Sequence, residues 1–361
     1  MRFPEFGGEW GKVVLSSACE INPKTDSLDN QFLYIDLESV VKGALVKRQI
    51  IEKDSAPSRA QRVLKKNDIL YQCVRPYQLN NYFFEGDTIQ CVASTGYAQL
   101  RTKHNPLYIF QALHTKQLTN QVLERCTGTN YPAINSSDLG TIEVPICSLP
   151  EQEKIGSLLA LIDSRIKTQS KIIEEQETLL KSLADKLFSQ NNHSCQLSEL
   201  VDIIKGKQLN ADNLFEEGDF YVMNGGITPS GYYSEYNVPA GVISISEGGN
   251  SCGYVQFNEE PFWSGGHCYS LRSKNAIVDY KYIYYFLKTK QTDVMALRIG
   301  SGLPNIQKKD IERFTMSFPP LQQQKQFVNA LDAVSARIDT EKRLLEKYRQ
   351  QKDYLLSRMF I

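Results

Sequence analysis

The sequence has no excess of either charge and no long hydrophobic run. Its 361 residues include 41 Lys and Arg and 41 Asp and Glu, so the formal net charge is zero. A simple DNA-binding protein usually carries a basic excess, so a role on DNA would require locally arranged cations or phosphate contacts from a partner. No run approaches the eighteen or so apolar residues of a membrane span, and residues 1–6 lack the apolar stretch of a signal peptide. We therefore expect a cytoplasmic protein that makes no membrane contact.

The sequence also lacks the usual signatures of metal binding and catalysis. Its eight cysteines are scattered, with none in a Cys-x-x-Cys pair, and its four histidines show no ligand spacing. No phosphate loop of the G-x-x-x-x-G-K-[ST] type and no Asn/Asp-Pro-Pro-Tyr/Phe methyltransferase motif occurs. We therefore expect free core thiols in a reducing compartment, with no metal and no catalytic residue in this chain.

The strongest positive signal in the chain is an internal repeat. Residues 128–134 (GTNYPAI) align with residues 300–306 (GSGLPNI) at an offset of 172. The same offset continues without a gap to Phe188 and Phe360. A gapless match of about sixty residues predicts that both halves of the chain contain the same structural segment.

The two halves also begin alike, although their middles differ. Residues 15–21 and 197–203 each start with Leu-Ser and end with an acidic residue followed by Ile. The middles, roughly 25–125 and 205–298, do not resemble each other in sequence. One repeated frame with two unlike inserts indicates a scaffold that presents two different binding surfaces.

A long helix is predicted after each copy of the repeated loop. Beyond Pro150 and Pro320 the chain becomes rich in Gln, Glu and Lys, and apolar residues recur at alternating steps of three and four. This is the pattern of a coiled-coil seam. We predict helices over 149–190 and 319–361 that pair antiparallel, with one mixed α/β domain at each end and a pseudo-two-fold relation between the halves. The predicted seam residues are Leu159, Ile162, Ile166, Ile173, Leu180, Leu183, Leu187, Leu331, Val334, Ile338, Leu345, Tyr348, Leu355 and Met359.

Polar residues interrupt this seam at Gln169, Gln176, Glu341 and Lys352, and such breaks can specify register at some cost in stability. The alternative is two ordinary amphipathic helices, each packed on its own domain. If the helices pair, two readers held on one face of a duplex would engage sites about one helical turn apart. Because the domains differ, the expected target is bipartite and asymmetric, with a fixed unread spacer.

The remaining segments, 1–148 and 191–318, are predicted as the two mixed α/β domains. They contain short alternating or apolar runs bounded by Gly, Asn and Pro, which are typical of strands, and longer runs with helical periodicity. Strands are expected at 241–246, 253–257 and 267–271, and helical segments at 107–123 and 279–287.

Candidate DNA-reading residues in the first domain lie in and after a basic stretch between Ser58 and Arg75. Arg can donate two hydrogen bonds to guanine, and Gln can pair in a similar way with adenine. The alternative is a solvated loop or an edge strand. The candidates are Arg59, Gln61, Arg62, Lys65, Arg75, Tyr77 and Gln78.

In the second domain the candidates lie in three Gly-rich turns, at 224–226, 247–251 and 264–267. Gly allows a backbone to approach a phosphate closely, and the polar side chains beside it could face DNA. The alternative is that these turns only connect strands. The candidates are Asn224, Asn250, Ser251 and His267.

This combination resembles the specificity subunits of type I restriction-modification enzymes. The resemblance covers essentially the whole chain and depends on the repeated loops, on the opening of each long helix and on the termini of the halves. Ser58–Arg62 and Glu247–Asn250 also resemble parts of known target recognition domains. The segments that carry the resemblance are Trp10 with 15–21, 149–155 (LPEQEKI), 300–306, 320–325 (PLQQQK) and 355–360 (LLSRMF).

The resemblance implies two target recognition domains separated by an antiparallel pair of helices. It implies binding to double-stranded DNA, to two methyltransferase (modification) subunits and to the restriction subunits. S-adenosylmethionine, ATP and Mg would be held by those partners, and this chain would hold no cofactor. The helices and the Pro-rich loops at their starts would be the docking surface. The loop at 127–132 is less regular than its second copy, so the resemblance does not imply equal DNA contact by the two domains.

Three rival hypotheses remain open. The first is an enzyme, a nuclease or methyltransferase with an unrecognised site, which activity of the purified chain alone would support. The second is a coiled-coil scaffold that binds only proteins, which would show no sequence-selective DNA binding even with its partners. The third is the specificity component of a related type II enzyme, which only its partner proteins would distinguish.

Overall fold

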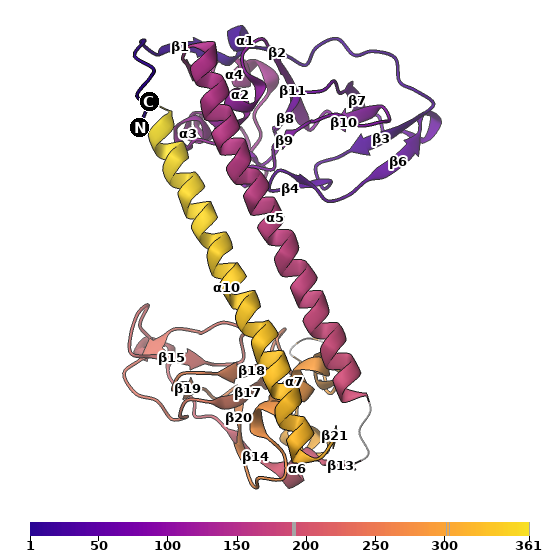
Figure 1. Cartoon of the computed structure of the whole chain (residues 1–361), viewed down its shortest axis with the longest axis vertical. Coiled ribbons are helices and arrows are strands. Elements are labelled where there is room, and N and C mark those ends of the chain that lie inside the picture. The colour runs from indigo at the N-terminus through magenta and orange to yellow at the C-terminus, as the bar shows by residue number, and fades with distance from the viewer. Residues whose placement is uncertain (190–192, 301, 303, 361) are drawn as a thin grey trace. The chain divides into compact units, whose positions relative to one another are not determined.

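The computed structural model describes residues 1–189, 193–300, 302 and 304–360, so Ser301 and Leu303 of the second repeated loop lie outside the described residues. The chain divides into unit 1, Met1–Lys171 with Lys342–Ile361, and unit 2, Ile172–Glu341 (Figure 1). Both divisions fall inside long helices, which are α5 (Leu149–Phe188) and α10 (Leu321–Met359). Each unit therefore combines one α/β domain with part of both helices.

The central sheet of unit 1 is antiparallel and is buried on both faces. Ala98 and Leu100 belong to the core formed with the helices, whereas Tyr97 belongs to the core formed with a second sheet. This follows from the period of two along a strand, which sends alternate side chains to opposite faces. Across the sheet the strands are β2 (Cys19–Ile21), β11 (Tyr97–Thr102), β8 (Ile69–Gln72) and β9 (Tyr82–Phe83). The helices of the first core are α1 (Leu15–Ala18), α2 (Pro106–Ala112), α3 (Lys116–Glu124) and α4 (Ser136–Gly140).

The second sheet of unit 1 has four strands, one pair of which is parallel. Leu33 and Cys91 are partners in that parallel pair. Across the sheet the strands are β6 (Gln49–Glu52), β3 (Gln31–Ile35), β10 (Cys91–Ser94) and β7 (Ala60–Val63). Shorter elements are β4 (Val40–Val41), β5 (Ala44–Leu45), η1 (Lys53–Ser55) and η2 (Pro76–Gln78).

Unit 2 also has a central antiparallel sheet covered by helices on one face. Tyr269 and Leu271 belong to the core formed with the helices. Across the sheet the strands are β14 (Val201–Lys205), β20 (Cys268–Ser273), β17 (Val242–Ser246) and β18 (Val255–Asn258). The helices are α6 (Leu197–Leu200), α7 (Tyr280–Thr289), α8 (Gln291–Ala296) and α9 (Lys308–Glu312). A smaller sheet contains β16 (Tyr232–Tyr233), β15 (Phe220–Met223) and β19 (Trp263–Ser264), and η3 covers Ala211–Asn213.

The two units share a frame that extends into the parts with unlike sequences. Arg101 lies opposite Glu20 on the neighbouring strand in unit 1, and Arg272 lies opposite Asp202 in unit 2, so β2-β11-β8 and β14-β20-β17 have the same strand order and register. The frame also includes a two-stranded ribbon in each unit. These ribbons are β1 (Gly11–Val14) with β12 (Glu143–Ile146), and β13 (His193–Gln196) with β21 (Thr315–Phe318). The middles that differ in sequence therefore contain a common three-stranded core with different additions.

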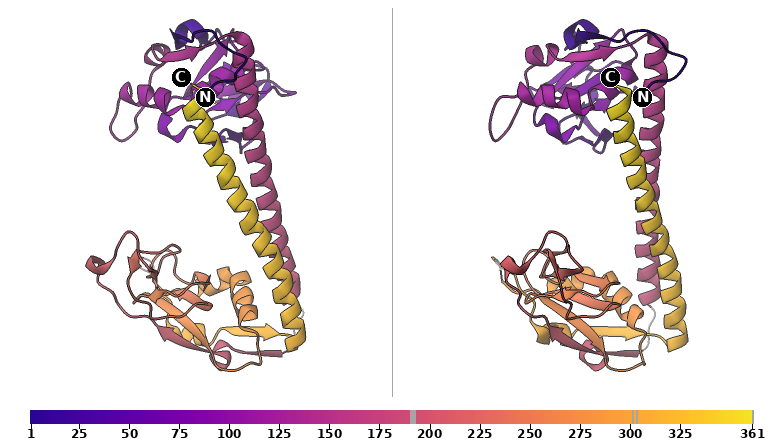
Figure 2. Two further views of the ribbon diagram at one scale, coloured as in Figure 1. Left: turned by 60° about the vertical axis from the view of Figure 1, so that its left-hand side comes forward. Right: turned by 90° about the vertical axis from the view of Figure 1, so that its left-hand side faces the viewer.

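Within each unit α5 and α10 lie side by side and run antiparallel (Figure 2). In unit 1, Leu159 near the start of α5 shares a core with Met359 at the end of α10. In unit 2, Phe188 at the end of α5 shares a core with Leu331 near the start of α10. Both helices also pack on the α/β domain of the unit, so their apolar stripes have two neighbours. All fourteen predicted seam residues are buried or half-buried.

The repeated glutamine at the start of each long helix has the same role in both units. Gln152 accepts a hydrogen bond from the Asn105 backbone N–H at 3.1 Å and donates to the Cys147 carbonyl at 2.7 Å. Gln324 accepts from the Asp279 backbone N–H at 2.7 Å and donates to the Pro319 carbonyl at 2.8 Å. Asn105 and Asp279 are the N-caps of α2 and α7. Each buried amide thus links a long helix to the first helix after the sheet, which explains why this glutamine is repeated.

Candidate nucleic-acid interface

The three Gly-rich turns of unit 2 meet at the end of β17. The Glu247 N–H donates to the His267 carbonyl at 2.9 Å, and the Asn224 side-chain oxygen accepts from the His267 N–H at 3.0 Å. Gly225 has a φ of +83°, and a Cβ there would lie 3.2 Å from the His267 Cβ and 3.4 Å from the Gly248 carbonyl oxygen. Only glycine fits this close approach without strain.

The second repeated loop packs on the same turn. Ile306 donates from its backbone N–H to the Glu247 carbonyl at 2.8 Å, and Gly249 donates to the Pro304 carbonyl at 3.0 Å. Asn250 is exposed at the tip of the turn and Ser251 is half-buried. The structure therefore brings Asn224 and His267 into one cluster, with Asn250 and Ser251 on the turn beside it.

A buried carboxylate lies at the centre of this cluster. Glu247 Oε1 accepts hydrogen bonds from Lys205 Nζ at 2.7 Å and from the Tyr269 hydroxyl at 2.8 Å. Its Oε2 is buried, has no hydrogen-bond partner among the described residues, and lies 3.6 Å from His267 Nδ1. Burial, together with the bond to Glu247, raises the pKa of Tyr269, which keeps this hydroxyl protonated as a donor.

The side chains of Lys205 and His267 therefore both lie against one buried carboxylate group. The Lys205 and His267 side chains are 55% and 59% exposed, whereas that of Glu247 is 6% exposed. Sequence reasoning selected His267 but not Lys205 or Glu247. The pairing joins residues 42 positions apart, and no local pattern marks it.

Unit 1 repeats this backbone geometry with other side chains. Cys73 donates to the Gly96 carbonyl at 3.0 Å, and Ile134 donates to the Cys73 carbonyl at 3.0 Å. Arg75 donates from its backbone to the Pro132 carbonyl at 2.7 Å. The end of β8 and the first repeated loop thus occupy the positions that the end of β17 and the second repeated loop occupy in unit 2. Cys73 stands where unit 2 has Glu247.

Arg75, Tyr77 and Gln78 lie in the short segment after β8. Arg75 has a φ of 53°, in the left-handed region, and its guanidinium carbon lies 4.5 Å from the centre of the Tyr131 ring. This cation–π contact orients the cation beside an exposed aromatic side chain. Tyr77 is 50% exposed, and the Gln78 side chain accepts a hydrogen bond from Gln72 at 3.0 Å. The structure therefore brings Arg75 to the first repeated loop.

The basic stretch before β8 divides into two groups. Arg59 is exposed, and its carbonyl accepts from Thr95, the residue before Gly96. Arg62 is half-buried close to Cys73, and its Nε is buried without a hydrogen-bond partner among the described residues. Burial lowers the pKa of Arg62, but an arginine remains charged in proteins. Arg59 and Arg62 therefore lie at the strand end that Arg75 also reaches.

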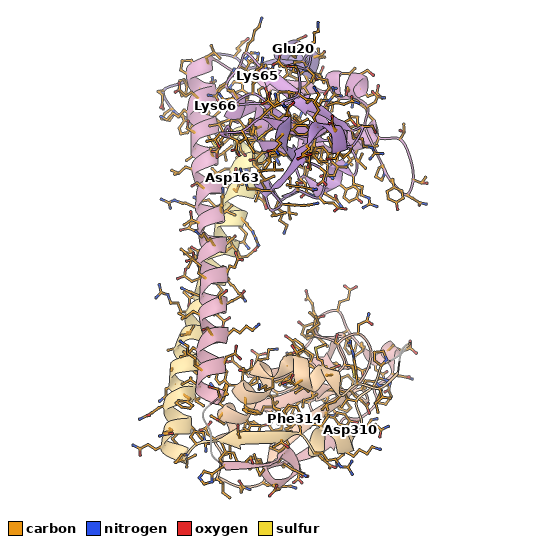
Figure 3. The ribbon with its side chains drawn as sticks, turned by 90° about the vertical axis from the view of Figure 1, so that its right-hand side faces the viewer. Glu20, Lys65, Lys66, Asp163, Asp310 and Phe314 are labelled. Carbon is orange, nitrogen blue, oxygen red and sulfur yellow. The ribbon has the colours of Figure 1, made fainter. Side chains whose placement is uncertain are left out.

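Gln61 and Lys65 are engaged locally instead. The Gln61 side chain donates to the Ser58 carbonyl at 2.7 Å, which closes the turn before β7. Lys65 Nζ lies 3.0 Å from an Asp26 carboxylate oxygen, and both side chains are 58% exposed. Lys65 is labelled in Figure 3 beside the likewise exposed Lys66.

The described part of the chain offers no cluster of three or more His, Cys, Asp or Glu side chains that could hold a metal ion. All eight cysteines are free thiols, and burial raises the pKa of each of them, for example that of Cys73 to about 11. Among the described residues, no helix has both the length and the apolar character to cross a membrane.

Comparison with known proteins gives a consistent match over both units. Residues 8–178 and 190–348 match the family model of the type I restriction modification DNA specificity domain. The chain is 26% identical over 270 residues to a protein of Mycoplasma genitalium named as a type I specificity subunit, which covers 70% of each chain. It is 30% identical over 166 residues to one of Mycoplasma pneumoniae, which covers 45% of this chain and 44% of the relative.

A solved structure has the same fold. The crystal structure of the type I restriction-modification S subunit from Mycoplasma genitalium matches with a TM-score of 0.73 at 21% identity, over 98% of this chain and 96% of that chain. The overlap includes both units, each with its central sheet and its segments of the long helices.

Proposed function

The chain belongs to the type I restriction-modification DNA specificity family, with two copies of the specificity domain, and on this premise we propose which surfaces read DNA. Each α/β domain is a target recognition domain, the first over 1–148 and the second over 191–318, with spacer helices over 149–190 and 319–361. One observation carries the proposal. The ends of β8 and β17 have the same backbone bonds to a repeated loop but carry unlike side chains, Cys73-Val-Arg-Pro-Tyr77 and Glu247-Gly-Gly-Asn-Ser251.

In this arrangement the repeated loops would make the same DNA contact in both units, whereas the strand ends would make different ones. Contacts to phosphates position a protein on DNA, whereas contacts to base edges carry the sequence information. The repeated loops are alike in sequence, which suits contact with the backbone, whereas the strand ends differ, which suits base reading. Unlike readers in one chain require a bipartite, asymmetric target.

The proposed reading residues follow from this division. In unit 1, Arg59, Arg62 and Arg75 offer guanidinium donors of the kind that pairs with guanine, with Gln61, Lys65, Tyr77 and Gln78 as flanking contacts. In unit 2, Asn224 and Asn250 offer amides of the kind that pairs with adenine, and Ser251 and His267 lie beside them.

The remaining partners would bind through the helices. Leu161 and Leu179 on α5 are 55% and 57% exposed, and Leu149 at its first turn is 58% exposed. Exposed leucines at several points along one helix suit a protein partner. We propose two methyltransferase subunits there, with restriction subunits joining the complex. Catalysis, S-adenosylmethionine, ATP and Mg would belong to those partners, and this chain would be non-catalytic.

A map of methylated adenines tests the proposal. The chain is expressed with its cognate methyltransferase subunit, and genomic DNA is compared with that of cells lacking the chain. We expect one bipartite, asymmetric motif that disappears without the chain, and replacement of residues 205–298 by those of another recognition domain should change one half only. A motif that persists without the chain, or no motif at all, would favour the protein-scaffold hypothesis.

A further inference from the structure

Unit 2 contains a cleft whose charged lining is entirely cationic. The cleft has a volume of about 300 Å³ and lies beside β14 and β20. Its charged lining residues are Lys205, Lys207 and Arg272, and no Asp or Glu among the described residues lines it. The Lys205 ammonium group binds Glu247 on the face of the sheet that carries Tyr269, opposite to the face of Arg272, so Lys205 lines the cleft without directing its charge into it. Residues 191–320, however, contain 11 Lys and Arg against 14 Asp and Glu. Two cations, Lys207 and Arg272, at one cleft of an otherwise acidic domain create a local positive potential, which attracts an anion.

The backbone that carries the two lysines is held rigidly. A Cβ on Gly206 would lie 2.2 Å from the Gly265 carbonyl oxygen, so only glycine permits the contact. Lys207 donates from its backbone N–H to the Ser264 carbonyl at 2.8 Å, and its own carbonyl accepts from Trp263 Nε1 at 3.0 Å. The Lys-Gly-Lys segment is thus attached to the turn that carries His267, next to the reading cluster.

Two cations of the cleft retain donors for a ligand. They are Lys207 and Arg272, since the Lys205 ammonium group is bound to Glu247 at 2.7 Å. Lys207 and Arg272 are exposed and have no ion pair with any residue in the described ranges. The nearest acidic residue along β14, Asp202, pairs with Lys274 at 3.2 Å instead.

The rest of the lining is neutral and partly apolar. Val238, Pro239 and Val242 line it on one side, and Ser264 and Ser270 contribute buried hydroxyl groups. The Tyr280 hydroxyl is already satisfied, because it accepts from the Ile243 N–H at 2.9 Å. Cations next to apolar side chains suit a ligand that joins a negative group to a less polar one, as phosphate and deoxyribose are joined in the DNA backbone.

We propose that this cleft binds a backbone phosphate of the DNA half-site read by unit 2, with Lys207 and Arg272 as the cationic contacts. The inference rests on the proposed DNA-reading function of unit 2. It assigns Lys207 and Arg272 to positioning, not to base reading, because they lie beside the Gly-rich turns and not on them. Each neutralised phosphate contributes about 0.9 to the slope of log affinity against log salt concentration.

The test uses the complex assembled with its methyltransferase subunits, and measures affinity for target and for random DNA over a range of salt. Lys207→Gln and Arg272→Gln are the informative variants, since replacing Lys205 would also leave Glu247 without its partner. We expect each variant to lose affinity severalfold on both DNAs, to reduce the salt slope by about one, and to keep the methylated motif. Lys290→Gln, on the helical side of unit 2 and outside the cleft, should leave the slope unchanged.

The outcomes distinguish this inference from the proposed function. A cognate motif that persists while Lys207→Gln and Arg272→Gln leave the salt slope unchanged overturns the cleft and keeps the function. A change in the methylated motif would show that Lys207 or Arg272 reads bases. An equal loss of salt slope with Lys290→Gln would show that only the net charge of the domain matters. Either result overturns the assignment. Saturable binding of free dAMP that these variants abolish, without loss of DNA affinity, overturns it in favour of a small-molecule site. Absence of any chain-dependent motif is instead a failure of the proposed function.

Discussion

Lys352 of α10 donates from its ammonium group to a carboxylate oxygen of Asp163 on α5 at 2.6 Å. The other Asp163 oxygen accepts from the Gln111 side chain of α2 at 2.7 Å. Asp163 is labelled on α5 in Figure 3. The polar break at Lys352, which interrupts the apolar seam, therefore joins both long helices and a domain helix within unit 1.

Lys352→Met should lower the stability of unit 1, because it leaves the half-buried Asp163 carboxylate without its cation. The Asp163 side chain is 35% exposed, so we expect a loss of about 1–2 kcal/mol, less than for a fully buried pair. Thermal unfolding of the full chain measures it. The double variant Lys352→Met/Asp163→Leu should recover most of the loss; a double variant less stable than either single one would contradict the ion-pair explanation.

Gln324→Ala should destabilise unit 2 through its backbone. The substitution removes the acceptor for the Asp279 N–H and the donor for the Pro319 carbonyl, and a buried group without a partner costs about 1–3 kcal/mol. Gln323→Ala is the matched control, because that side chain is exposed on the same turn and should change the unfolding temperature little. Equal shifts of the unfolding temperature for the two substitutions would show that the hydrogen bonds of Gln324 add no stability.

Acid should destabilise unit 1 through His114. Burial, with the nearby charge of Lys352, lowers the pKa of His114 to about 4. In the neutral ring, Nδ1 lies 2.7 Å from the Phe110 carbonyl and Nε2 lies 3.3 Å from the Asn81 amide nitrogen. One donor and one acceptor then satisfy both contacts, whereas a proton on Nε2 would face the Asn81 donor.

Because the pKa of His114 is lower in the folded chain than in the unfolded chain, acid lowers the stability of unit 1. The unfolded chain takes up the proton near the ordinary histidine pKa of about 6.5, and the folded chain only near 4, so the stabilisation is complete above about pH 6.5 and is lost as the pH falls toward 4. The full loss is about 3 kcal/mol at 1.36 kcal/mol per pKa unit. Urea unfolding across this range should show a flatter pH profile for His114→Gln. The exposed His193→Gln should keep the wild-type profile; if His114→Gln keeps it as well, another group is responsible.

Much of the frame could be predicted because it depends on residues that the two halves repeat. Gln152 and Gln324 stand at the same offset as the repeated loops and make equivalent hydrogen bonds. The long helices were predictable for a similar reason, since an apolar stripe at helical spacing is visible in sequence. The segment 107–123, predicted as helical, forms two helices, α2 and α3, because the chain breaks after α2 and Thr115 caps the start of α3.

The common three-stranded core of the two unlike middles could not be predicted from the sequence, because paired strands tolerate an exchange of side-chain size. Ala98 lies opposite Tyr71 in unit 1, whereas Tyr269 lies opposite Ile245 at the equivalent pair in unit 2. Backbone hydrogen bonds keep the register while the large and small side chains change places, so the sequences do not align. The Glu247 cluster of unit 2 could be predicted only in part, for another reason. The bond from Lys205 to Glu247 joins two strands that are distant in sequence, and only the folded sheet brings them together.

The last prediction concerns base reading by unit 1, where the structure separates two exposed cations of the same basic stretch. Arg59 is exposed beside the strand end that carries Cys73, whereas the Lys65 ammonium is paired with Asp26 at 3.0 Å. Arg59→Ala should therefore relax one position in one half of the methylated motif, at a cost of about 1–3 kcal/mol for a lost bidentate contact to guanine. Lys65→Ala is the matched control: it removes a flanking cation that is not proposed to contact a base edge, so both halves of the motif should stay unchanged.

Methylation mapping with each variant and the cognate methyltransferase subunit decides between three results. A relaxed base in one half identifies Arg59 as a reader, and it also assigns that half to unit 1. Uniform loss of methylation at every site, with the motif intact, would show that Arg59 contacts phosphate and that unit 1 reads bases from Arg62 or Arg75 instead. A motif altered by Lys65→Ala but not by Arg59→Ala would mean that the Asp26 pair opens on DNA, so that the free-state ion pair is a poor guide to the bound surface.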